Sequence, residues 1–164
     1  MVIPGVEEQS SGADAAAVVL QNARAKARAG LEMTVAGSVL GADTDVVLDG
    51  RLLGKAADPP SARERLEALS GRAHQVLTAL VLLDRDSGAE RSGVERTTVR
   101  FRDIDDFLLE RYVSSGEWRD RAGGYAVQGL GSALVESVEG DLSNVIGMPV
   151  RLFAQLAPEF LPKP

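Results

Sequence analysis

Carboxylates and a lysine are placed close together between residues 39 and 55, in the stretch VLGADTDVVLDGRLLGK. Asp43 and Asp45 follow two small residues, and Lys55 closes the stretch. A carboxylate can accept a proton or bind a divalent cation, and an ammonium group can hold a phosphate. This stretch is therefore a candidate for chemistry, although solvated carboxylates at a strand end and a surface lysine would give the same pattern.

A β-hairpin is the element that would bring these groups together. Val39-Leu40 is typical of the end of a buried strand, and Val46 to Leu48 form a second apolar run. Asp49-Gly50 is a two-residue hairpin signal, after which Arg51 to Leu53 would lead the chain back. We therefore expect Lys55 to return to the neighbourhood of the carboxylates.

The segment GADTDVVLDG, followed by LLGK, resembles the central signature of the Maf-type nucleoside triphosphate pyrophosphatase family, in which GADTVV, a short hairpin and GKP follow one another. Ala56 stands where the family has proline, which alters the stiffness of the loop and leaves the lysine in place. Other segments resemble the family's motifs in the same order along the chain: VIPGVEE, NARAKARA, SGRAHQVLT, YAVQGLG and GDLSNVIGMP. The resemblance therefore covers nearly the whole chain.

The resemblance implies an α/β fold, with a mixed, twisted sheet, flanking helices and a cleft between two lobes. We expect residues 1–164 to form a single domain of this kind, since the chain is long enough for one core. The family pattern begins with a strand and an SxRR motif that grips phosphate, and no such motif precedes Val2. The domain is therefore expected to be N-terminally incomplete relative to the family.

The implied reaction is hydrolysis of a nucleoside triphosphate to the monophosphate and pyrophosphate. In this interpretation Asp43 accepts the proton of the attacking water or holds the metal, Mg²⁺ or Mn²⁺, with Glu8 as a second metal ligand that also lines the substrate cleft. Strand alternation would place Asp45 on the same face as Asp43, so Asp45 is an alternative metal ligand. Lys26 and Lys55 would hold the phosphates, although a lysine near a helix end is also explained by the helix dipole.

Base selection is assigned by the same resemblance to Thr44 and Gln128, which match the subgroup that acts on dTTP and UTP. A loop amide that bonds the backbone is the alternative role of Gln128. His74 is interpreted as a structural residue rather than a catalytic one. The rival class of function is a catalytically impaired nucleotide-binding protein or a dimeric interaction protein, because the SxRR motif is not found.

Composition excludes several other kinds of site. The chain has no cysteine and one histidine, which removes disulfides, thiolate catalysis and polyhistidine metal sites. A formal charge of -6 disfavours stable binding to nucleic acid, and no apolar run is long enough for a membrane span. We expect a cytoplasmic protein that binds a nucleoside triphosphate, with a homodimer expected from the resemblance alone.

The remaining elements follow from apolar spacing and from helix-ending residues. We expect a helix over 13–29 that stops at Gly30 and a helix over 103–113 whose core face includes Phe107. Ser143 should be the N-cap of a last helix that continues to about Leu156. The other expected elements are a helix over 61–69, a long antiparallel pair over 74–83 and 94–101, and a strand over 134–138.

Overall fold

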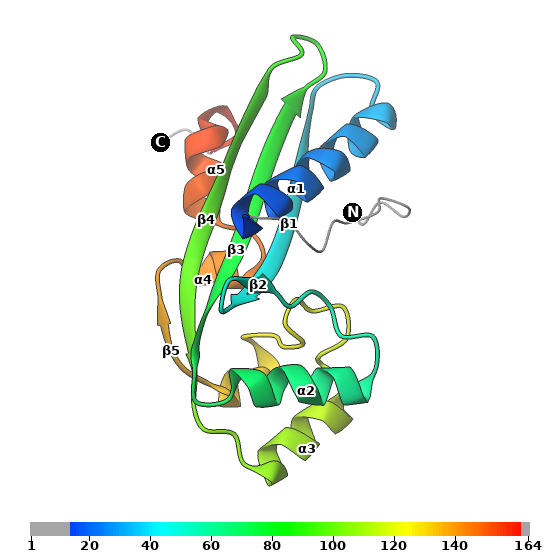
Figure 1. Ribbon diagram of the computed structural model, residues 1–164. Coiled ribbons are helices and arrows are strands. Elements are labelled where there is room, and N and C mark those ends of the chain that lie inside the picture. The colour runs from blue at the N-terminus through cyan, green and yellow to red at the C-terminus, as the bar shows by residue number, and fades with distance from the viewer. Residues whose placement is uncertain (1–13, 162–164) are drawn as a thin grey trace.

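A five-stranded antiparallel sheet forms the frame of the computed structural model, which describes residues 14–161. The strand order is β2-β1-β3-β4-β5, as Figure 1 shows. The helices and strands are α1 (Ala15–Glu32), β1 (Ser38–Leu48), β2 (Arg51–Leu52), α2 (Pro59–Leu69), β3 (Ala73–Asp84), β4 (Glu90–Phe101), α3 (Asp106–Ser115), η1 (Gly129–Ala133), β5 (Val135–Glu139), α4 (Leu142–Ile146), α5 (Val150–Leu156) and η2 (Pro158–Phe160). The expected α/β class with flanking helices is confirmed. Every strand pair among the described residues is antiparallel, whereas a mixed sheet was expected.

The hairpin predicted around Asp49-Gly50 is present, between β1 and β2. Asp49 has φ of 51° and Gly50 has φ of 77°, and positive φ at both central residues is what a type I′ turn requires. The expectation that a strand ends at Val39-Leu40 is wrong, because residues 38–48 form one continuous strand. Asp43 therefore lies in the middle of β1, where it pairs with Ala79 of β3.

Helix α1 packs closely across one face of β1 and β3 (Figure 1). Ala23 and Ala27 are fully buried there, and Gly41 of β1 lies directly beneath them. A Cβ atom at residue 41 would come within 2.6 Å of the backbone nitrogen of Ala27, closer than real Cβ atoms approach backbone. Glycine at this position thus permits a contact between helix and strand that no other residue would allow.

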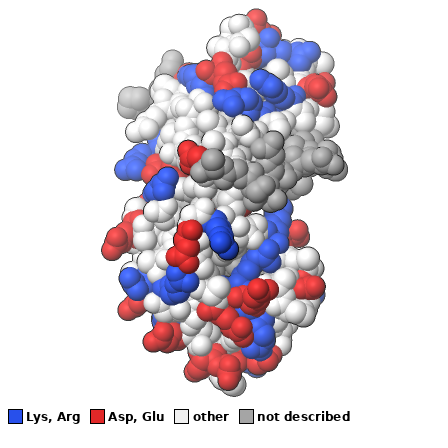
Figure 2. Space-filling model, in the orientation of Figure 1, with Lys and Arg blue, Asp and Glu red and all other residues white. Residues whose placement is uncertain are grey.

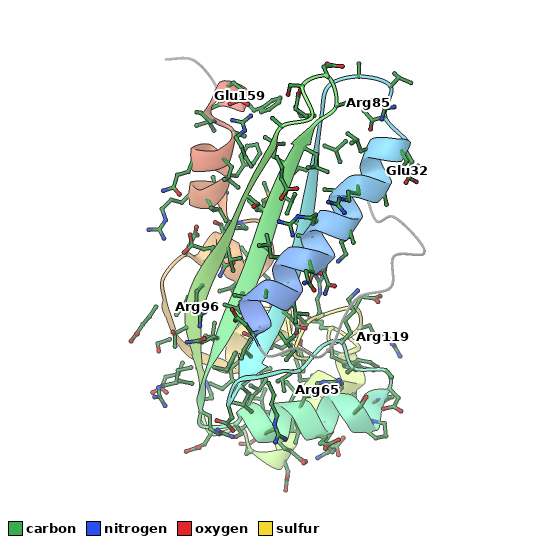
Figure 3. The ribbon with its side chains drawn as sticks, turned by 45° about the horizontal axis from the view of Figure 1, so that its top comes forward. Glu32, Arg65, Arg85, Arg96, Arg119 and Glu159 are labelled. Carbon is green, nitrogen blue, oxygen red and sulfur yellow. The ribbon has the colours of Figure 1, made fainter. Side chains whose placement is uncertain are left out.

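Helix α1 ends later than expected. Gly30 was predicted to stop it, but Gly30 is buried inside the helix, and Met33 is the C-cap. Arg85 supports this end of α1, because its Nη1 donates to the carbonyl oxygen of Leu31 at 2.6 Å. Figure 3 shows Arg85 close to Glu32, the last residue of α1. Tertiary contact at the helix end overrides the low helix propensity of glycine.

Two hydrophobic clusters share the long strands of the sheet. The first joins α2 and α3 to one end of β1, β3 and β4, and includes Leu66, Tyr112 and Phe101, each with no measurable exposure. The second lies between α1 and the face of β1 and β3, and includes Val19 and Val81. Since β1 and β3 belong to both clusters, residues in the middle of these strands lie between them.

Three expectations for the helices outside the sheet are wrong. Phe107 was expected in the core, but it is 76% exposed, and Leu109 is buried instead because α3 begins only after the N-cap Asp105. The last helix is two helices, since Gly147 adopts φ of 105° and ends α4 before α5 begins. The N-cap of α4 is Asp141 and not Ser143 as expected, and the side chain of Asp141 accepts from the backbone N–H of Ser143.

Charged side chains of both signs are interspersed on the face drawn in Figure 2, over the residues that are coloured. No helix within residues 14–161 is long and apolar enough to cross a membrane.

Candidate functional site

A pocket of about 460 Å³ lies where β1 and β3 meet the loop over residues 117–129 and the end of α4. Its lining includes five residues that the sequence predicted for a site: Lys26, Asp43, Thr44, Lys55 and Gln128. Glu8, the remaining predicted residue, lies outside the described residues. The structure therefore brings together residues that are up to 102 positions apart in the chain, from Lys26 to Gln128.

Asp43 is the buried acid of this pocket, with an exposed fraction of 6%. The ammonium nitrogen Nζ of Lys26 lies 2.6 Å from Oδ1, and Nδ2 of Asn22 donates to Oδ2 at 3.1 Å. Asn22 and Lys26 are four residues apart on α1 and so lie on the same helix face. The close packing of α1 on Gly41 is what brings this face to the carboxylate.

Asp45 has a different environment from Asp43. Its Oδ1 accepts from the backbone N–H of Val46 at 2.7 Å and of Gly54 at 2.9 Å. The bond from Gly54 ties the strand β1 to the segment that follows β2, just before Lys55. The contacts of Asp45 thus favour a role in fixing the hairpin, and its role as an alternative metal ligand stays a prediction.

Lys55 is exposed, and its backbone is held from two sides. Lys55 forms an isolated antiparallel bridge with Ala122, and Gly54 accepts at its carbonyl oxygen from the N–H of Gly123 at 2.8 Å. Arg65 of α2, labelled in Figure 3, donates from Nε to the carbonyl oxygen of Leu53 at 2.9 Å. The backbone at Lys55 is thereby fixed while its side chain is exposed at the pocket.

The loop that carries Gln128 is anchored by buried aromatic hydroxyls. Tyr112 accepts at Oη from the N–H of Ala126 at 3.0 Å, and Oη of Tyr125 lies 2.7 Å from Nε2 of His74. Burial lowers the pKa of His74 to about 4, and it raises the pKa of Tyr125. Both groups are therefore neutral at pH 7, and the contacts of His74 are those of a structural residue.

Glu117 holds the turn that follows Gln128. Its two carboxylate oxygens accept from the N–H groups of Leu130 and Gly131, each at 3.2 Å, at the start of η1. Gln128 is the N-cap of η1 and makes no capping bond with its own side chain. The side chain of Gln128 is exposed at the pocket, so the amide would become buried only beneath a ligand.

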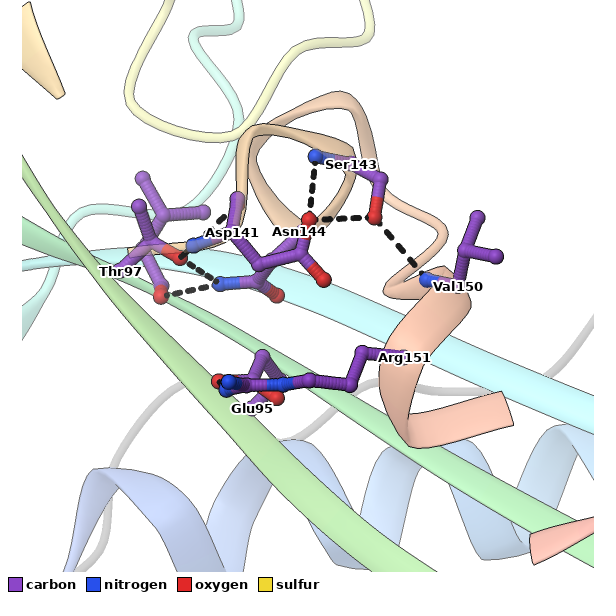
Figure 4. A network of polar contacts seen from close by, with 8 residues as sticks. Glu95, Thr97, Asp141, Ser143, Asn144, Val150 and Arg151 are labelled. Atoms are coloured by element: carbon purple, nitrogen blue, oxygen red, sulfur yellow. Dashed lines mark hydrogen bonds and ion pairs between the residues drawn. The ribbon is translucent and has the colours of Figure 1, made fainter. Parts of the chain in front are cut away.

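Thr44 connects the pocket to a network of buried polar groups. Its Oγ1 lies 2.9 Å from Oγ1 of Thr78, which donates to the carbonyl oxygen of Asn144 at 3.1 Å. The amide of Asn144 donates to Oγ1 of Thr97 at 3.0 Å and to the carbonyl oxygen of Val76. Figure 4 shows how Asn144, Thr97 and the turn at Asp141 join in this network.

Several residues of the site were not predicted from the sequence. Asn22 had a usable signal, because it lies one helical turn before Lys26. Glu117, Asp120 and Arg121 line the pocket from a turn whose spacing follows no regular period. Thr78 reaches Thr44 across the β1–β3 pair, and that register is set by the tertiary fold.

The chain matches known proteins over nearly all of its length. The family model described as Maf-like protein matches residues 1–160. A protein of Pyrococcus furiosus named dTTP/UTP pyrophosphatase is 45% identical over 119 residues, which are 73% of this chain and 62% of that relative. Proteins of the same name are 41% identical over 151 residues in Pyrococcus horikoshii and 45% identical over 155 residues in Alcanivorax borkumensis. These alignments cover 92% and 93% of this chain, and 80% and 79% of the relatives.

Proposed function

The chain belongs to the Maf-like protein family, and from this premise we propose that it hydrolyses a nucleoside triphosphate to the nucleoside monophosphate and pyrophosphate. The preferred substrates in this proposal are dTTP and UTP, after the name of the relatives. The observation that carries the proposal is the buried carboxylate of Asp43 in a pocket that Lys26, Lys55 and Arg121 also line. A carboxylate beside several cations suits a reaction in which water attacks a polyanion.

In the proposed reaction the oxygen of a water molecule forms a bond to the α-phosphorus. The bond between that phosphorus and the oxygen that bridges to the β-phosphate breaks, so pyrophosphate leaves. Asp43 accepts the proton of the attacking water at one carboxylate oxygen and later returns it to solvent. Lys26 and Asn22 hold the carboxylate in place during this transfer, and Lys55 and Arg121 attract the phosphates.

A divalent cation, Mg²⁺ or Mn²⁺, would suit the carboxylate of Asp43 together with a bound polyphosphate. Such cations bind oxygen, and Mg²⁺ commonly takes one or two carboxylates together with phosphate oxygens and water. Within residues 14–161 no group of three or more acidic, histidine or cysteine side chains is arranged to hold a metal, so Asp43 would be the ligand from this part of the chain. Glu8 remains the second proposed ligand. When bound, the cation would offset the negative charge of the phosphates.

Base selection is proposed to come from Thr44 and Gln128, in the pocket that Val145 and Ile146 also line. The amide of Gln128 can donate to a pyrimidine carbonyl oxygen. Because Gln128 is exposed, this pairing forms when the base covers it. Discrimination should then come from leaving the amide unpaired beneath a wrong base, at a cost of about 1–3 kcal/mol.

The test is release of pyrophosphate from a panel of canonical and modified nucleoside triphosphates, with Mg²⁺ or Mn²⁺ and with chelator. We expect turnover of dTTP and UTP above GTP, loss of turnover with chelator, and loss of turnover in Asp43→Asn. Calorimetry with the same nucleotides separates the rival function, because binding without pyrophosphate release would identify a nucleotide-binding protein. Better turnover of GTP or of a methylated guanine nucleotide would contradict the proposed substrate class.

We further propose that the protein acts in the cytoplasm, where nucleoside triphosphates are made and used, and that it forms a homodimer. Light scattering after gel filtration would test the dimer.

A further inference from the structure

We propose that Thr78 is a positioning residue that fixes the hydroxyl of Thr44 as a hydrogen-bond acceptor towards the pocket, and so selects ligands that present an N–H group. This inference rests on the proposed function, and it adds a residue and a direction of hydrogen bonding to the proposed base selection. Thr78 is fully buried in β3 and is not part of the pocket lining.

The direction follows from counting hydrogens along the network. A threonine hydroxyl has one hydrogen to donate and two lone pairs that accept. The carbonyl oxygen of Asn144 can only accept, so Thr78 donates its hydrogen there, across 3.1 Å. The hydrogen in the 2.9 Å contact between the two hydroxyls must then come from Thr44. Thr44 has no hydrogen left for a ligand and offers the pocket a lone pair.

Asn144 is held firmly enough to serve as the end of this network. It has no measurable exposure, and its carbonyl oxygen also accepts from the N–H of Gly147 at 2.9 Å. Its side-chain amide donates to Val76 and to Thr97 at 3.0 Å. Thr97 in turn bonds the backbone at Asp141, the N-cap of α4 (Figure 4). The acceptor for Thr78 is thereby fixed by both strands β3 and β4.

The surroundings of Thr44 suit a flat heterocycle. Val76, Val145, Ile146 and Gly147 line the pocket together with Thr44, and the site of a Cβ atom at Gly147 is 3.5 Å from Oγ1 of Thr44. An acceptor among apolar residues favours a ring that presents a donor at its edge. The 2,4-dioxopyrimidine ring of uracil or thymine carries N3–H, whereas N3 of cytosine is an acceptor that would face the lone pair of Thr44.

Thr78→Val tests this assignment, because valine keeps the shape of the buried side chain and removes the hydroxyl. The hydroxyl of Thr44 then loses its acceptor and can turn its hydrogen to the pocket. We expect the ratio of kcat/KM for UTP to that for CTP to fall about threefold to tenfold, the worth of one neutral hydrogen bond. The change should lie in KM, since the contact is remote from the reacting phosphorus.

Control variants distinguish a loss of base selection from a loss of folding. Thr98→Val makes the same change on the neighbouring strand β4, outside the pocket lining, and should leave the ratio unchanged. Thr78→Ser keeps a hydroxyl and should restore most of the ratio. A ratio that stays at the wild-type value in Thr78→Val, with thermal unfolding intact, would overturn the inference, as would a wild-type protein that does not prefer UTP to CTP.

Binding provides a readout that does not depend on turnover. Calorimetry with UMP and CMP should give the same order of preference, and the same loss of preference in Thr78→Val. If the protein releases no pyrophosphate but prefers UMP to CMP and loses this preference in Thr78→Val, the proposed reaction is refuted and the role of Thr78 is supported. If the wild-type protein hydrolyses UTP but binds UMP and CMP equally, the role of Thr78 is refuted and the proposed reaction is supported.

Discussion

The ammonium nitrogen of Lys26 lies 2.6 Å from Oδ1 of Asp43, so one of the two lysines expected to hold phosphate is in contact with the proposed base. The pair is formed between α1 and β1, and the carboxylate is the more buried partner, with 7% of its side chain exposed against 29% for the lysine. An ion pair in this environment fixes the direction of the carboxylate. Lys26 can thus orient the base and still face a phosphate from its exposed side.

Asp43→Asn should abolish the proposed turnover without unfolding the protein. The amide keeps the volume of the side chain but cannot accept a proton from water, so kcat should fall by at least about 100-fold. The melting temperature should stay within a few degrees of wild type. Pyrophosphate release and circular dichroism measure the two quantities, and turnover at the wild-type rate would remove Asp43 from the mechanism.

Asp45→Ala is the matched comparison, and it should act mainly on stability. It removes the acceptor for the N–H groups of Val46 and Gly54 and loosens the segment that leads to Lys55. We expect the free energy of unfolding to fall by about 1–3 kcal/mol and KM to rise. A fall in kcat as large as that of Asp43→Asn, in a folded protein, would instead support Asp45 as a metal ligand.

Asn22→Leu should lower kcat because it removes the donor to Oδ2 of Asp43 while keeping a similar volume. Misplacement of the base should cost about 10-fold to 100-fold in kcat. Gln21→Leu is the control, since Gln21 is the exposed neighbour of Asn22 on α1 and its change should leave kcat as it is. Equal kinetics for the two variants would show that Asn22 does not position Asp43.

Gly41→Ala should push α1 away from β1. The added methyl group would lie 2.6 Å from the backbone nitrogen of Ala27, so we expect a loss of about 1–3 kcal/mol of stability and a lower kcat as Asn22 and Lys26 move. Gly93→Ala is a control in another strand, where the added atom meets Cδ1 of Leu152 at 2.7 Å. That side chain can turn away, so its loss should be smaller. Urea unfolding would rank the two variants, and the reverse order would contradict the packing argument.

His74 should make the protein less stable as the pH falls. Its pKa in the folded protein is about 4, below the ordinary value of 6.5, because burial disfavours the charged ring. The unfolded chain therefore binds the extra proton between these values, and stability that is complete above pH 6.5 is lost towards pH 4. The loss reaches about 3 kcal/mol at most.

Urea unfolding of wild type and His74→Gln at pH 7, 5.5 and 4.5 would isolate this effect, since the carboxylates titrate in both proteins. The stability of His74→Gln should fall less steeply over this range. If the free energy of unfolding falls equally with pH in the two proteins, the ring of His74 is not held neutral.

Local signals were enough to predict much of the fold, and five of the residues proposed for the site from the family resemblance line one pocket. The dipeptide Asp49-Gly50 predicts the turn that the structure contains. The apolar residues of β3 predict the long antiparallel pair of β3 and β4. The errors lie where contacts between distant segments override local preference. Gly30 continues a helix because α1 packs on the sheet, and Thr78 acquires its role from the register of β1 against β3. The spacing of residues in the sequence predicts neither the continuation of α1 through Gly30 nor the contact between Thr78 and Thr44.

The middle of β1 lies between the two clusters that share β1 and β3, and this makes it the rigid part of the pocket. Asp43 and Thr44 lie in the middle of β1, where backbone amides should exchange with solvent only when the whole sheet opens. Lys55 and Gln128 lie on loops, and their side chains are exposed at the pocket. The proposed base is thus part of the rigid frame, whereas the side chains proposed to contact the nucleotide can change conformation without disturbing it.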